Sequence, residues 1–169
     1  WSLSTTYART GASSYSTGAT YPHSACGGLR SPALVLGAGP VLTYHHVYST
    51  QSGHDGGRVE ISTDGGTSWE ALNPSPAYPG ALTEGTNACS WPGPTACYTG
   101  DSPGFPTARQ AATVDLSAWS GLTVLLRWSF TSDAGTGGSL ASPGWYVDDI
   151  QVTNVERPGP CVTRSPLAF

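Results

Sequence analysis

Lysine and methionine are absent from this chain of 169 residues, and charged residues make up only 11% of it. All seven basic residues are arginines, and they are scattered singly along the sequence. A nucleic-acid surface needs clustered basic residues to displace counterions from phosphates, so no nucleic-acid partner is expected. Without an amine side chain, a lysine Schiff base, a Walker-type phosphate lysine and a Lys–Asn isopeptide bond are excluded.

Long apolar runs are also missing. No segment approaches the about 18 apolar residues of a membrane-spanning helix, so no membrane span is expected. No charged-then-apolar leader opens the chain, which begins at Trp1 without a methionine. We therefore expect a part processed or excised from a larger protein, long enough to bury a sizeable core as one domain.

Glycine and proline are frequent, with 22 and 14 residues, and six Trp and eight Tyr argue against disorder. Helical periodicity is missing, whereas short alternating or apolar runs between Gly, Pro, Ser and Asp clusters indicate strands. We expect strands over 34–36, 41–49, 58–63, 68–72, 111–116, 122–130 and 145–155, with an edge strand or two from the first 30 residues. Because many short strands must pack face to face, the fold class predicted is all-β: a two-sheet antiparallel β-sandwich of jelly-roll type.

Four cysteines indicate the compartment. Cys26, Cys89, Cys97 and Cys161 show no two-residue spacing of a zinc or redox motif, and an even count in a loop-rich chain is typical of two disulfides in a secreted, extracellular protein. Three pairings are possible. We expect Cys89 to pair with Cys97 around the Trp-Pro-Gly-Pro loop, which leaves Cys26 for Cys161. The alternative is four reduced, buried thiols in a cytosolic protein.

Four segments, in this order and spacing, carry a resemblance: Leu-Arg-Ser-Pro-Ala-Leu at 29–34, the stretch 42–69 with Asp-Gly-Gly and Ser-Thr-Asp-Gly-Gly, Arg-Trp-Ser-Phe at 127–130, and Gly-Trp-Tyr-Val-Asp-Asp-Ile at 144–150. Together they resemble the MAM-like jelly-roll domain that secreted bacterial metallopeptidases of the immune inhibitor A type carry behind their catalytic unit. The resemblance covers most of 29–155. We expect one such domain over 1–169, and the resemblance does not account for a disulfide-bearing loop insertion at 85–106 or for a proline-rich tail at 157–169.

The resemblance implies the accessory domain and not the enzyme, because the His-Glu-x-x-His signature of the family's catalytic unit is absent. We expect a non-catalytic extracellular module of a larger secreted protein, a peptidase, which engages substrate or a surface. Its partners would be a polysaccharide or an extracellular protein, together with the parent catalytic domain. A carbohydrate-binding module using exposed aromatics and a protein–protein adhesion module are the alternatives.

Signatures of catalysis are missing as well, so the chain is predicted not to be an enzyme. No Gly-x-Ser-x-Gly elbow occurs. Glu60 and Glu70 belong to the expected hairpin over 58–72 and are predicted to face solvent. A free-standing hydrolase or lyase on a β-sandwich is the rival interpretation, and its sign would be Asp, His and Tyr clustered in one groove.

Structural calcium is a further expectation. Asp148 and Asp149 are neighbours in an expected strand, so they should face opposite sides, and one of them should lie beside apolar residues. Asp55 lies in a Gly-rich loop, and calcium takes carboxylate and carbonyl oxygens. The resemblance suggests a calcium ion near these three residues. Otherwise Asp148 or Asp149 pairs with Arg127 or accepts backbone amides in a turn.

Aromatic residues in the insertion are the candidates for ligand binding. Trp91, Tyr98 and Phe105 lie outside the regular apolar stripes of the expected strands. Exposed Trp and Tyr stack on sugar rings or anchor protein partners. The alternative is that these three rings pack a small core under the long loop.

Overall fold

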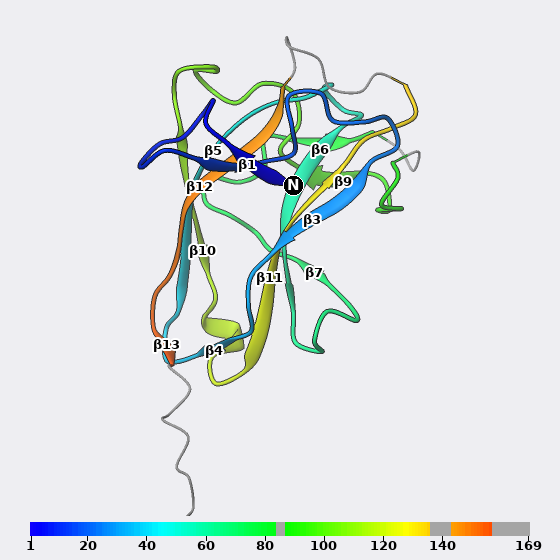
Figure 1. The fold of residues 1–169 in the computed structure, drawn as a ribbon. Helices are drawn as coiled ribbons and strands as arrows, with labels where there is room; N and C mark the ends of the chain where they lie inside the picture. The colour runs from blue at the N-terminus through cyan, green and yellow to red at the C-terminus, as the bar shows by residue number, and fades with distance from the viewer. Residues whose placement is uncertain (84–86, 136–142, 157–169) are drawn as a thin grey trace, which may run out of the picture.

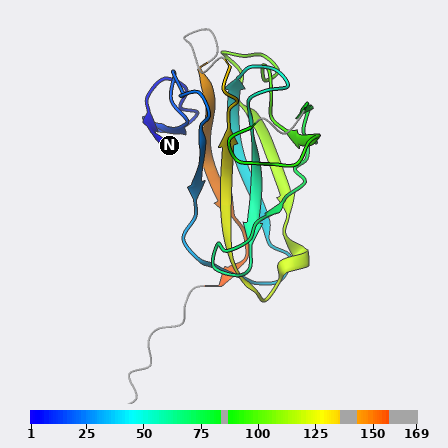
Figure 2. The ribbon, with the colours of Figure 1, turned by 90° about the vertical axis from the view of Figure 1, so that its right-hand side faces the viewer.

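Two antiparallel sheets stacked face to face form the body of the molecule (Figures 1 and 2). The structure is a computed structural model that describes residues 1–83, 87–135 and 143–156. The first sheet has the order β1 (Ser2–Ser4), β2 (Ser14–Ser16), β12 (Gly144–Val152), β5 (Val41–Ser49), β10 (Gln110–Asp115). Within the described ranges, no helix is long and apolar enough to cross a bilayer.

The second sheet has the order β13 (Val155–Glu156), β4 (Leu34–Leu36), β11 (Thr123–Thr131), β6 (Gly56–Ser62), β7 (Glu70–Ala71), and β3 (Cys26–Arg30) also pairs with β11. A separate hairpin consists of β8 (Gly80–Leu82) and β9 (Thr95–Cys97). A single 3-10 turn, Ser117–Trp119, precedes β11.

The all-β sandwich predicted from the alternation of apolar residues is confirmed, and the jelly-roll connectivity stays a prediction. On β5 the even-numbered residues from Leu42 to Tyr48 are buried in the core, as period-two alternation requires. Opposite them, β11 contributes Val124, Leu126, Trp128 and Phe130. The first 30 residues supply three strands, more than the one or two expected.

A bulge interrupts β12 at Asp149. The register runs from Gly144 to Asp148 and resumes only at Gln151, with one extra residue on β12, and Asp149 has a φ of 49°. An extra residue breaks the alternation of side chains. The expectation that Asp148 and Asp149 face opposite sides is therefore wrong, because both carboxylates contact the segment between β1 and β2.

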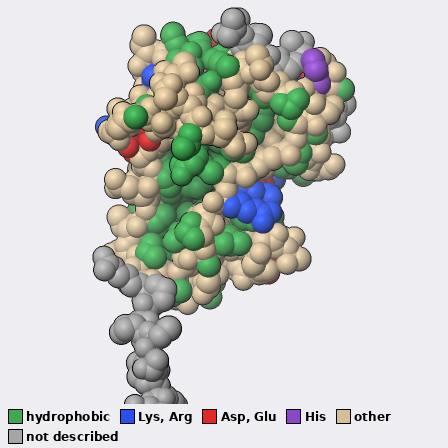
Figure 3. Space-filling model, in the orientation of Figure 1, with side chains coloured by type: hydrophobic (Ala, Val, Ile, Leu, Met, Phe, Trp, Pro, Cys, Tyr) green, Lys and Arg blue, Asp and Glu red, His purple; other side chains and the backbone are tan. Residues whose placement is uncertain are grey.

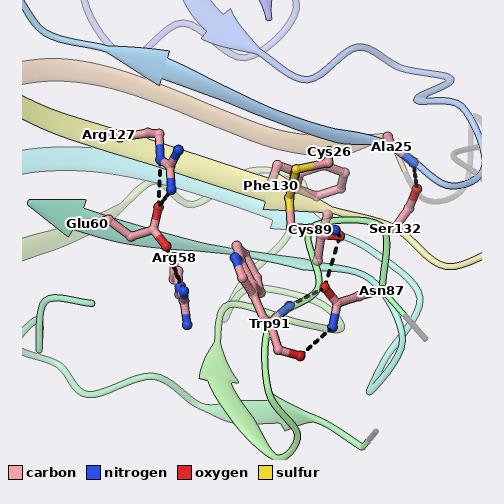
Figure 4. Close-up of a disulfide and its surroundings, with 11 residues drawn as sticks. Ala25, Cys26, Arg58, Glu60, Asn87, Cys89, Trp91, Arg127, Phe130 and Ser132 are labelled. Atoms are coloured by element: carbon pink, nitrogen blue, oxygen red, sulfur yellow. Dashed lines mark hydrogen bonds and ion pairs between the residues drawn. A yellow bond between two sulfur atoms is a disulfide. The ribbon is translucent and has the colours of Figure 1, made fainter. Parts of the chain in front are cut away.

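The disulfide joins Cys26 at the start of β3 to Cys89 in the loop between β8 and β9 (Figure 4). The expected pairs Cys89–Cys97 and Cys26–Cys161 are thus wrong. The loop folds back across the second sheet, where the Cys89 N–H donates to Thr131 Oγ1 at 3.0 Å, and this places Cys89 beside β3. Cys97 is a buried free thiol whose pKa burial raises to about 12, and Cys161 lies outside the described residues.

Trp145 anchors the core between the sheets. Its indole N–H donates to Nδ1 of His46 at 3.2 Å, and burial lowers the pKa of His46 to about 3, so this histidine is a neutral acceptor near neutral pH. The indole ring lies against β6 at Gly57, where an added Cβ would overlap Cε3 and Cζ3 of the ring. Glycine is required here by the close approach of the ring.

We expect Gly57→Ala to destabilise the fold by about 3 kcal/mol or more, because the core would have to shift to avoid overpacking. Gly27→Ala is the matched control. Both glycines pair with Phe130, from opposite sides of β11, but a Cβ on Gly27 meets no atom within 4 Å. Urea unfolding followed by tryptophan fluorescence measures both variants. Equal free energies of unfolding for the two would contradict this account of the core.

Candidate functional site

Four charged side chains lie on the outer face of the second sheet, and Figure 4 shows three of them, Arg58, Glu60 and Arg127. On β6, Val59 and Ile61 point into the core, so Arg58 and Glu60 point outward. Arg127 on β11 lies directly opposite both Glu60 on β6 and Arg30 on β3 in the strand register. The sheet therefore brings three arginines and one glutamate from three strands into one cluster.

Glu60 is fully buried between two of these arginines. Nη2 of Arg58 lies 2.7 Å from Oε1, and Nη2 of Arg127 lies 2.5 Å from Oε2. Nε of Arg58 also donates to Oε1, at 2.8 Å, and Nε of Arg127 also donates to Oε2, at 2.6 Å. The expectation that Glu60 faces solvent is wrong: it is on the outer face of the sheet, but the two guanidinium groups enclose its carboxylate.

Two tryptophans stack on the guanidinium groups. Cζ of Arg127 is 4.1 Å and Cζ of Arg30 is 5.2 Å from the ring centre of Trp69, while Cζ of Arg58 is 4.3 Å from that of Trp91. Stacking on an aromatic face suits the planar, weakly hydrated guanidinium. Each arginine of the cluster thus has its side-chain direction set by a ring.

Local hydrogen bonds fix the two rings. The Trp69 indole N–H donates to the carbonyl of Gly66 at 3.1 Å, within the turn that follows β6. Asn87 accepts from the backbone N–H of Trp91 at 3.0 Å and donates to its carbonyl at 3.1 Å (Figure 4). Asn87 and Cys89 together tie the β8–β9 loop to the second sheet.

A hollow of about 340 Å³ opens beside this cluster. Its lining residues are Cys26, Gly27, Gly28, Arg30, Cys89, Trp91, Arg127 and Ser129. The arginines line one part of it, Trp91 and the disulfide another, and no acidic residue is among the lining. A Cβ on Gly28 would come within 2.7 Å of Cδ of Arg127, so glycine lets the Arg127 side chain pass. Figure 3 shows arginine side chains as a patch over the second sheet.

Arg30 differs from the other two arginines. It is exposed, and within the described residues no carboxylate pairs with it. Its cross-strand neighbour is Arg127, and like charges directly opposite each other destabilise a sheet. Stacking on Trp69 offsets part of this cost. The guanidinium of Arg30 keeps its hydrogen-bond donors available to an anion.

Two of the three aromatic residues predicted to bind ligand are buried. Trp91 packs with Leu82 and Cys97 in a small core of its own, and Tyr98 is in the main core, where its hydroxyl lies 2.8 Å from that of Tyr44. Trp91 thus matches the alternative of a small core under the loop, whereas Tyr98 belongs to the main core. Phe105 is half-buried. It contacts Tyr7, with ring centres 5.9 Å apart. Of the three, only Trp91 borders the hollow.

Asp148 and Asp149 bind the segment between β1 and β2. Oδ2 of Asp148 accepts the backbone N–H groups of Arg9 and Thr10, at 2.7 and 3.3 Å. Asp149 accepts the Thr10 hydroxyl and pairs with Nη1 of Arg9 at 2.6 Å, and these contacts lower its pKa. The arginine partner is therefore Arg9 and not Arg127. Its guanidinium occupies the position that a cation would take.

Asp55 belongs to a different cluster, at the start of β6. It is fully buried, with Oδ2 accepting the Tyr21 hydroxyl at 2.8 Å and Oδ1 accepting the Asp133 N–H at 2.9 Å, and burial raises its pKa. Four residues earlier, Oε1 of Gln51 is buried without a hydrogen-bond partner. The three predicted calcium ligands are thus not brought together. Within the described ranges, no three His, Cys, Asp or Glu residues gather as a metal group.

The arginine cluster was missed from sequence. Its local signal was present, since Arg58 and Glu60 alternate with apolar residues on one strand and Arg127 does so on another. That these strands are neighbours, and that Arg30 joins them, depends on pairing across more than 60 residues of chain. No protein-family model and no curated protein matches the chain.

We expect Glu60→Gln to lower the free energy of unfolding by about 3 kcal/mol, because it leaves two adjacent guanidinium groups without a counter-charge. Glu70→Gln, an exposed glutamate on the neighbouring strand, is the matched control and should change stability by less than about 0.5 kcal/mol. Urea unfolding at neutral pH measures both. A Glu60→Gln variant as stable as the control would show that the carboxylate does not organise this face.

Proposed function

We propose that this chain is a non-catalytic, extracellular binding module of the β-sandwich type, part of a larger secreted protein. The resemblance of 29–155 to the MAM-like jelly-roll domain suggests a peptidase as the parent protein. The module would attach its parent to a substrate or a surface. The observation that carries the proposal is the hollow on the second sheet, with its arginine and tryptophan walls and with Arg30, which pairs with no carboxylate of the described residues.

Stability alone does not account for this hollow. A neutral or acidic residue at position 30 would remove the like-charge pair with Arg127, yet the chain has an arginine there. Departures from local stability concentrate where a protein binds its partners. Arginine and tryptophan are also the residues most enriched in binding hot spots. Both are present here on a rigid sheet.

The disulfide supports the extracellular part of the proposal. Cys26–Cys89 links the hollow's wall to β3, and disulfides persist in oxidising compartments. A wall fixed by a covalent bond loses little conformational freedom when a ligand binds, which favours affinity.

Retention of the isolated chain on insoluble polysaccharides and on fibrous proteins tests this function. We expect the chain to be retained on at least one solid and Arg30→Gln to be washed from it. Arg9→Gln, the same loss of charge on the first sheet, should be retained as the unmodified chain is. Retention on none of the solids would overturn the binding function. Equal retention of the two variants would overturn the assignment of the site.

We also propose that calcium stabilises the module, with Asp55 as its anchor. Asp133, whose backbone binds Asp55, and the unpartnered Oε1 of Gln51 supply further oxygen atoms at this end of the sandwich. Asp148 and Asp149 are not included, because Arg9 pairs with Asp149 and the backbone N–H groups of Arg9 and Thr10 bind Asp148.

We therefore expect the melting temperature to be higher in calcium chloride than in chelator, by about 2–4 °C for each kcal/mol of binding free energy. Asp55→Asn keeps the shape of the side chain and removes its charge, so it should abolish this difference. Melting followed by circular dichroism measures the effect. Identical melting of the unmodified chain in calcium and in chelator would contradict calcium binding.

A further inference from the structure

The geometry points to an oxyanion as the group that the hollow binds, and we infer that an anionic polysaccharide carries it, as a carboxylate or as a sulfate ester. The inference rests on the proposed binding function and names its ligand class. It follows from three features of the hollow: which of its arginines lack an ion pair, the neighbouring positive charges of Arg30 and Arg127, and the polarity of its lining.

Guanidinium groups supply the donors that an oxyanion needs. Arg30 and Arg127 both line the hollow, and no acidic side chain does. Arg127 donates Nε and Nη2 to the Glu60 carboxylate, whereas Arg30 has no ion pair within the described residues. A free guanidinium binds a carboxylate or a sulfate through two parallel, charge-assisted hydrogen bonds. Arg30 is therefore the primary contact of the anion.

The like charges of Arg30 and Arg127 also favour an anion between them. These two residues are direct cross-strand neighbours, and Trp69 stacks against both guanidinium groups. The ring fixes the two groups on the same side of the sheet without neutralising them. Glu60 compensates the charge of Arg127, and an oxyanion next to this pair would compensate that of Arg30.

The lining of the hollow favours a polysaccharide over an acidic peptide. Gly27, Gly28 and Ser129 line the hollow with backbone and one hydroxyl group. Peptide partners anchor large apolar side chains in pockets, and the only large apolar side chain lining the hollow is Trp91, which is buried and already stacked on Arg58. A sugar acid is polar along its rim and needs no such pocket. The hollow lies on an open sheet face, which an extended chain can cross.

Affinity measurements with soluble polymers test the inference. The unmodified chain is titrated with polygalacturonate, with its methyl-esterified neutral form, with dextran sulfate, with neutral dextran and with polyglutamate. We expect at least tenfold tighter binding to a charged polysaccharide than to its neutral counterpart, and weaker binding as sodium chloride is raised. The polygalacturonate and dextran sulfate arms distinguish a carboxylate from a sulfate.

Variants of Arg30 separate binding from folding. Arg30→Gln should weaken binding to the charged polysaccharide at least tenfold, and Arg30→Lys severalfold, because lysine keeps the charge but loses the planar fork. Arg9→Gln should bind as the unmodified chain does. Arg30→Glu should abolish binding without lowering the melting temperature, since the new carboxylate lies opposite Arg127.

Each of the other possible outcomes would contradict a specific part of this inference. Equal affinity for charged and neutral polysaccharides would overturn the oxyanion, while the binding function would stand. Equal or tighter binding of polyglutamate would overturn the polysaccharide in favour of an acidic protein. Unchanged affinity in the Arg30 variants would overturn the site. No binding to any polymer, together with no retention on any solid, would overturn the inference and the function on which it rests.

Discussion

The outer face of the second sheet depends on one buried carboxylate. Glu60 is out of contact with water, and a buried charge is tolerated only when partners compensate its lost hydration. Arg58 and Arg127 do so from the two sides, each through Nε and Nη2 on a separate oxygen. The carboxylate thereby fixes the planes of both guanidinium groups. Trp91 stacks on that of Arg58, and Trp69 stacks on that of Arg127. Glu60 therefore helps to position the two loops that carry Trp69 and Trp91 on the sheet.

The segment that carries Cys89 acquires a defined role in this arrangement. It is fastened to the second sheet by the disulfide to Cys26 and by the N–H groups of Ala88 and Cys89, which donate to Ser132 and Thr131. The two hydrogen bonds between Asn87 and Trp91 brace the loop internally, and Trp91 is buried beneath it. In the proposed binding function, the segment would form a rigid wall beside the arginines, and a rigid wall lowers the entropy cost of binding.

Alternation of residues along the chain predicts those features that are local to one strand. The bounds of β5 and the inward stripe of β11 follow from it. The turn after β6 follows from its Asp-Gly-Gly sequence, and Gly65 and Gly66 both adopt positive φ there. Alternation does not predict the features that depend on contacts between different strands. The burial of Glu60 requires two arginines that are neighbours only through pairing. The disulfide depends on where a long loop meets the sheet, and the bulge at Asp149 shifts the alternation on which the face prediction relied.

The two outer faces of the sandwich differ in how their charges are compensated. On the first sheet, Asp148 and Asp149 are satisfied by Arg9 and Thr10 from the segment between β1 and β2, and Tyr7 of the same segment stacks on Tyr146. On that face Asp149 is ion-paired and Asp148 accepts backbone N–H groups. On the second sheet, Arg58 and Arg127 share one carboxylate, and Arg30 lies beside them without an ion pair among the described residues. Within the described ranges Arg30 has no carboxylate partner, so an anion from outside would compensate a charge that the sheet leaves unpaired. This contrast within one molecule supports the proposal that the second sheet binds a ligand, whereas the contacts of the acidic pair on the first sheet indicate a structural role.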